Sequence, residues 1–224
     1  MTISTDSDAA DHAAASATGT GAATGRNRLT WLLVAAALVV GTALGLGIGL
    51  VVPHLRTPGD DSVEAGFLRD MAVHHAQAVE MSMIVHQKSD NPEIVYLAND
   101  IALTQHGQIG YMQAWLRDWH LDLTSTRTPM SWMPNSEGSV VNGLMPGMAT
   151  PEQLAALRQA TGKALDIQYL TLMRQHHLGG IHMAQEAQRL AGNDDVKWLA
   201  GTMVQSQQGE IKLIDDLLKK AQAS

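Results

Sequence analysis

The amino-acid sequence predicts an all-α protein, a four-helix bundle built from two duplicated helical hairpins and preceded by one transmembrane helix. Three observations lead to this fold class. The stretch 67–109 matches 169–211 without a gap, which indicates an internal duplication. Apolar residues recur at three- and four-residue spacing, and no stretch alternates with the period of two that a strand requires. Finally, residues 29–52 are uncharged, apolar and long enough to cross a bilayer.

The N-terminal part divides into a tail, an anchor and a linker. Residues 1–28 contain almost no large apolar side chains, so we expect a disordered tail. The apolar stretch 29–52 is longer than the apolar region of a usual signal peptide and lacks a small-x-small cleavage site, which favours an uncleaved anchor over a cleaved signal. Arg26 and Arg28 precede it and predict a cytoplasmic N-terminus. Residues 53–61 would then link a single-pass cell-membrane anchor to an extracytoplasmic domain, residues 62–224.

Composition limits the partners and the chemistry. The net charge of −7 argues against nucleic acid, because phosphate binding requires a basic face. Gly41, Gly45 and Gly49 follow the four-residue spacing that allows two membrane helices to approach closely, so a homo-oligomer is possible, although glycine is also common in membrane helices. The chain has no cysteine, so a metal site would have to use histidine, methionine and carboxylates.

Helix start signals divide the C-terminal domain. The first helix is expected over 62–88, and Asn91 followed by Pro92 starts a second helix that runs to about His120. Thr150 caps a shorter helix, and Gly192 separates the last two long helices. Two hairpins with a long crossover between them predict an up-and-down or ferritin-like four-helix bundle.

The crossover, roughly 121–149, is too long for a plain turn and is rich in sulfur and aromatic side chains. Two interpretations stay open, a flexible copper-gathering loop or an apolar plug for one end of the bundle. The residues concerned are Met130, Trp132, Met133, Met145 and Met148.

A methionine–histidine motif recurs in the two halves of the domain. Its first copy is Met71-x-x-His74-His75 followed by Met81, and an acid, Glu64, precedes it. With Met71 as the zero of a helical wheel, His75 lies at about +40°, His74 at about −60°, Met81 at about −80° and Glu64 at about +20°. All five therefore face broadly the same way. The second copy consists of Asp166, Met173, His176, His177 and Met183.

This residue set predicts copper, because imidazole binds several transition metals whereas thioether selects soft ions such as Cu(I). Adjacent histidines diverge by about 100°, so the two imidazoles of one pair should not share one ion. The competing interpretation is structural: inward methionines fill cores, and a buried histidine is often only hydrogen-bonded. His182 points almost opposite to the motif and is a poor candidate on the wheel.

The domain also closely resembles family 305 of the domains of unknown function, a ferritin-like group, over about residues 62–220. The resemblance rests on FLRDMAVHHAQAVEMSMIV, ALDIQYLTLMRQHHLGGIHMAQEA and the preceding MPGMATPEQLAAL. It implies a secreted or membrane-anchored protein, and some members are copper-binding proteins linked to copper tolerance. Glu64 departs from the aspartate more typical of the first acid position. The resemblance implies ligands at Met71, His74, His75, Met81, Asp166, Met173, His176, His177, His182 and Met183.

Three functions compete. We expect a membrane-anchored copper-binding protein that buffers copper, confers tolerance or passes the metal to a delivery partner, without catalysis. A dinuclear iron or manganese oxidoreductase is the alternative, but such sites use Glu-x-x-His, and methionine stands in the glutamate position here. A structural or partner-binding bundle, whose histidines are core residues or respond to pH, is the third.

Overall fold

The computed structural model describes residues 22–223, without the side chains of 22–26 and 48–56. Residues 1–21 of the predicted disordered tail lie outside the described residues. The chain divides into two compact units, with the boundary after Arg56, and the second unit is Thr57–Ser224. The second unit contains residues 62–224, for which the bundle domain is predicted.

Helix α1, Ala22–Arg56, contains the predicted anchor. Its segment Asn27–Gly47 is long and apolar enough, by length and composition alone, to cross a membrane. Large apolar side chains such as Trp31 are exposed along it. The helix extends beyond 29–52 at both ends and takes in residues predicted as tail and linker, because helix formation propagates into flanking residues that are not themselves apolar.

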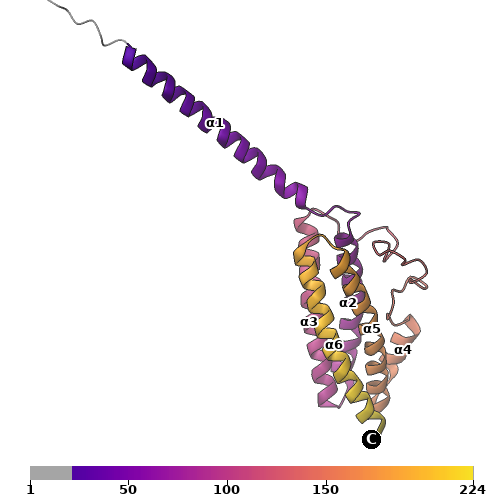
Figure 1. Cartoon of the computed structure of the whole chain (residues 1–224). Helices are drawn as coiled ribbons and strands as arrows, with labels where there is room; N and C mark the ends of the chain where they lie inside the picture. The colour runs from indigo at the N-terminus through magenta and orange to yellow at the C-terminus, as the bar shows by residue number, and fades with distance from the viewer. Residues whose placement is uncertain (1–21, 224) are drawn as a thin grey trace, which may run out of the picture. The chain divides into compact units, whose positions relative to one another are not determined.

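Four long helices and one short helix form the second unit, and the fold class is confirmed as all-α (Figure 1). Among the described residues there is no strand, only an isolated bridge between Val141 and Leu144. The helices are α2 Val63–Lys88, α3 Pro92–Asp118, α4 Pro151–Gln159, α5 Gly162–Leu190 and α6 Asp194–Ala223.

Polar side chains cap the starts of these helices close to the predicted positions. Ser62 accepts from the Ala65 amide at 3.1 Å before α2, and Asn91 accepts from the Glu93 amide at 3.0 Å before α3. Each bond satisfies an amide that has no partner inside the first helical turn. The remaining side-chain caps are Thr150 for α4 and Asn193 for α6.

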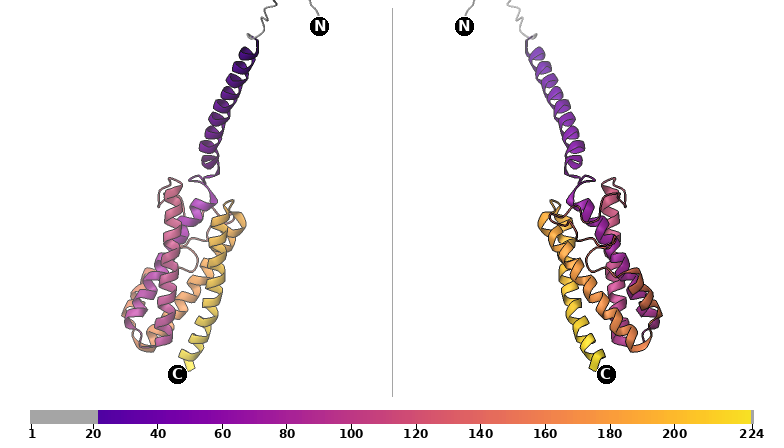
Figure 2. Two further views of the ribbon diagram at one scale, coloured as in Figure 1. Left: turned by 90° about the vertical axis from the view of Figure 1, so that its left-hand side faces the viewer. Right: turned by 90° about the vertical axis from the view of Figure 1, so that its right-hand side faces the viewer.

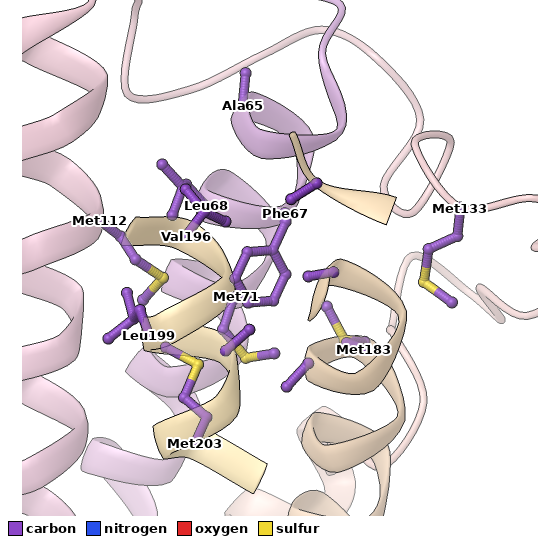
Figure 3. Close-up of a cluster of buried hydrophobic side chains, with 14 of the residues drawn as sticks. Ala65, Phe67, Leu68, Met71, Met112, Met133, Met183, Val196, Leu199 and Met203 are labelled. Atoms are coloured by element: carbon purple, nitrogen blue, oxygen red, sulfur yellow. The ribbon is translucent and has the colours of Figure 1, made fainter. Parts of the chain in front are cut away.

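The two hairpins, α2–α3 and α5–α6, join chiefly through α2 and α5, whereas α3 and α6 barely touch (Figure 2). The core consists of two clusters of buried side chains. The methionine-rich cluster includes Phe67, Leu68, Met71, Met112, Met183 and Met203 (Figure 3). The aliphatic cluster includes Met81, Ile94, Ile101, Leu165, Met173 and Ile214.

Polar side chains of α2, among them Asp70 and Gln77, hold the crossover against the bundle. Asp70 accepts from the Met130 amide at 2.6 Å and from the Trp132 indole at 2.9 Å. Gln77 donates to the Ala149 carbonyl at 2.9 Å and accepts from the Ala149 amide at 2.6 Å. The crossover methionines Met130, Met133 and Met145 are buried in the methionine-rich cluster. The crossover therefore packs along α2, from Asp70 to Gln77, as part of the apolar core.

Candidate metal centre

Four histidines lie in the middle of the bundle, and none has any solvent exposure. His74 on α2 and His176 on α5 face each other where the two hairpins meet, with ring centroids 3.8 Å apart and planes inclined by 33°. His75 and His177 turn away toward the second helix of their own hairpins. Adjacent helical positions diverge by about 100°, so the two imidazoles of each pair lie in different surroundings, as predicted.

His75 and His177 have equivalent hydrogen-bond partners in the two hairpins. His75 Nε2 contacts Gln108 Oε1 of α3 at 2.8 Å, and His177 Nε2 contacts the Glu210 carboxylate of α6. Gln108 and Glu210 occupy corresponding positions of the duplicated unit. The duplication therefore includes the hydrogen-bond partners as well as the histidines.

The hydrogen bonds define one tautomer for all four imidazoles. His74 Nε2 lies 3.1 Å from the Pro146 carbonyl oxygen, and His176 Nε2 lies 2.8 Å from the carbonyl oxygen of His74. Carbonyl and carboxylate oxygens only accept hydrogen bonds, so each Nε2 carries a proton, and in a neutral imidazole Nδ1 then carries the lone pair. Every one of these Nδ1 atoms is buried without a hydrogen-bond partner among the described residues.

Burial keeps the imidazoles of His74, His75 and His176 neutral. It lowers the pKa of His74 from 6.5 to about 4 and, together with the neighbouring His74, the pKa of His75 to about 3. The pKa of His176 is also well below its usual value, because of burial and then the nearby histidines. A neutral imidazole with an available lone pair is the form that binds metal ions.

Two buried glutamines lie near the histidine layer, which consists of His74, His75, His176 and His177, and have no hydrogen-bond partner among the described residues. Gln105 is 2% exposed and Gln207 is 1% exposed, and neither amide group makes a hydrogen bond within the described structure. A Cβ on Gly180 would lie 2.7 Å from Gln207 Oε1 and 3.3 Å from His74 Cε1, so glycine makes room for both side chains. Neither glutamine belongs to the predicted site, although their recurrence at the same position of both copies is a signal in the sequence.

The motif methionines flank the histidine layer in pairs from the two hairpins. Met71 and Met183 belong to the methionine-rich cluster, and Met81 and Met173 belong to the aliphatic cluster. All four are fully buried. Along α2, Met71 precedes the histidines and Met81 follows them, so thioethers are available on both sides of the layer.

The two predicted acids lie away from the histidines, and each supports the opposite hairpin. Glu64 accepts from the Gly192 amide at 2.6 Å and from the Asn193 amide at 3.0 Å, in the loop before α6. Asp166 accepts from the Ser89 hydroxyl at 2.6 Å, in the loop before α3. Both carboxylates are therefore engaged in hydrogen bonds, at opposite ends of the bundle.

His182 also lies outside the histidine layer. It is exposed and lines a surface pocket with Met130, Met133 and Glu186. This position agrees with the helical wheel, which directed His182 away from the other motif residues. Among the described residues, no three His, Asp or Glu side chains converge as a metal site.

Comparison with known proteins places this arrangement in a family. The model of the family described as "Domain of unknown function (DUF305)" matches residues 64–218, which contain every predicted site residue. The chain belongs to the DUF305 family. No curated protein matches it.

Several solved structures share the fold. A Streptomyces coelicolor DUF305 protein, inferred to be secreted, is 45% identical, with a TM-score of 0.67 over 73% of this chain and 96% of that one. A DUF305 fragment from Deinococcus radiodurans is 27% identical, with a TM-score of 0.59 over 70% of this chain and 96% of the fragment. CopM in its Cu(II)-bound form is 24% identical, with a TM-score of 0.56 over 71% and 97%.

Proposed function

We propose that this protein is a membrane-anchored, extracytoplasmic copper-binding protein that holds Cu(I) through the imidazoles and thioethers of its duplicated motif. The observation that carries the proposal is the set of four buried Nδ1 atoms without partners. Leaving a buried polar atom unsatisfied costs about 1–3 kcal/mol, so four in one layer are a large cost unless they have a ligand.

The ligand set fits a soft ion. Met71, Met81, Met173 and Met183 supply thioethers on both sides of the histidine layer. Thioether and imidazole suit Cu(I), and the bonds at Nε2 would orient each ring and strengthen Nδ1 as a ligand. The proposed role requires no catalysed reaction, because buffering copper or passing it to a partner protein is binding alone.

The comparisons support this choice of metal. CopM has been solved in Cu(I)-bound and silver-bound forms, with 22% and 21% identity to this chain. Silver(I) resembles Cu(I) as a soft, monovalent ion. The apolar segment of α1 and the two arginines before it support an anchor with the second unit outside the cell. We place His182 outside this buried site, in its surface pocket.

Isothermal titration calorimetry of the full chain in detergent micelles tests the proposal, with Cu(I) under anaerobic conditions and Ag(I) as a redox-inert probe. We expect tight binding that His75→Ala and His177→Ala each weaken. His106→Ala is the matched control, because His106 is an exposed histidine on α3. Equal affinity in all of these variants would sink the proposal. Nitrogen NMR adds a direct criterion, since binding should shift Nδ1 resonances more than Nε2 resonances.

A further inference from the structure

The duplication places two sets of four residues at corresponding positions. Histidine and the preceding methionine are kept in both sets, whereas the residues on the second helix of each hairpin have diverged. Gln108 corresponds to Glu210, and Met112 corresponds to Ile214. The first set is Met71, His75, Gln108 and Met112, and the second set is Met173, His177, Glu210 and Ile214.

The first set is neutral and rich in thioether. Met71 lies one helical turn before His75 on α2, and Met112 lies one turn after Gln108 on α3. The 2.8 Å contact between His75 and Gln108 joins the two helices at this level. Met71 and Met112 are both fully buried in the methionine-rich cluster, where Met203 adds another thioether (Figure 3).

The second set carries a negative charge and a single thioether. Glu210 accepts from His177 Nε2, and its side chain is only 12% exposed. Met173 lies one turn before His177, but the fully buried Ile214 stands where the first set has Met112. Ile101, which lies in the aliphatic cluster with Met173, corresponds to Met203, which lies in the methionine-rich cluster with Met71. The second set therefore has a carboxylate beside its histidine and fewer thioethers in its surroundings.

These differences act on metal choice in the same direction. A carboxylate bonded to the far nitrogen of an imidazole increases the electron donation of the metal-binding nitrogen and places a negative charge near the ion. A second thioether instead favours a soft, monovalent ion. We propose that the two halves have diverged into inequivalent copper sites: one at Met71 and His75 selects Cu(I), and one at Met173 and His177 also accepts Cu(II). Gln108 and Glu210 act as positioning residues, and the inference rests on the proposed function.

Exchanging the diverged residues tests the inequivalence, in the full chain in detergent micelles, with Ag(I) and Cu(II) as probes. Glu210→Gln should lower Cu(II) affinity about 10- to 100-fold, the usual effect of losing such a partner, while Ag(I) affinity changes far less. Gln108→Glu should create a second Cu(II) site, visible as doubled bound Cu(II) in electron paramagnetic resonance. Met112→Ile should weaken Ag(I) alone, and Ile214→Met should strengthen Ag(I) at the other half.

The outcomes separate this inference from the proposed function. A wild-type chain that binds neither ion refutes both. A chain whose two sites bind each ion equally, or a Glu210→Gln variant that loses Ag(I) and Cu(II) in the same proportion, refutes only the inequivalence. A purely structural Glu210 would also not produce the gain of Cu(II) in Gln108→Glu, so that variant decides the question even if Glu210→Gln fails to fold.

Discussion

Substitution of Gly179 by alanine should force the crossover away from α5. A Cβ at this position would lie 1.9 Å from the Pro146 carbonyl oxygen and 2.5 Å from the Pro146 carbonyl carbon. Both are backbone atoms, so no side-chain rotation relieves the overlap. Since close carbon–oxygen contacts are about 3.3 Å, the crossover must move by about 1.4 Å.

This movement also disturbs the histidine layer. The Pro146 carbonyl that must move is the acceptor for His74 Nε2, at 3.1 Å. Overpacking a tight contact costs about 1–3 kcal/mol, and leaving a buried polar group unsatisfied costs about 1–3 kcal/mol more. We therefore expect Gly179→Ala to lower the free energy of unfolding by about 2–6 kcal/mol.

Guanidinium unfolding of the full chain in micelles, followed by circular dichroism, measures the effect. Gly209→Ala is the matched control, because Gly209 is also helical but nothing lies within 4 Å of its hypothetical Cβ. The control should stabilise the protein by up to about 1 kcal/mol, the difference in helix propensity. If Gly179→Ala were as stable as the control, the close packing of the crossover on α5 would be refuted.

Two further predictions concern pH and the caps. Because the pKa of His74 falls to about 4 in the fold, from 6.5, the unfolded chain binds more protons between these values. The contribution of His74 to the free energy of unfolding should thus be fully present above pH 6.5 and fall by about 3 kcal/mol as the pH approaches 4. Unfolding titrations of metal-free protein at several pH values check this, and a flat profile would contradict it. Glu64→Ala removes the acceptor for two amides before α6 and should cost about 1–2 kcal/mol in the same unfolding assay. Ag(I) affinity should not change in that variant, and a loss would return Glu64 to the ligand set.

Local signals in the sequence were sufficient to predict the helices and the directions in which the motif side chains point. The cap at Asn91 and the capping Thr150 act within one turn, so their effect is local and visible in sequence. Helical geometry also predicted that His74 and His75 diverge and that His182 points away. The duplication predicted two similar hairpins, since each copy repeats the same apolar and polar pattern.

Contacts between distant segments were not predictable in this way. Glu64 has the spacing of a motif acid, yet it bonds to amides 128 and 129 positions later. The Pro146 carbonyl that orients His74 belongs to the crossover, whose course depends on close approach at Gly179. Neither contact has a periodic signal, because both depend on how the two hairpins and the crossover pack.

Anomalous scattering from crystals of the Cu(I)-loaded protein tests the central claim most directly. We predict copper peaks inside the bundle, beside the Nδ1 atoms of the buried histidines and a motif thioether, with each Nε2 still bonded to its oxygen acceptor. Peaks confined to exposed histidines such as His86 and His106, or coordination through Nε2, would contradict the account.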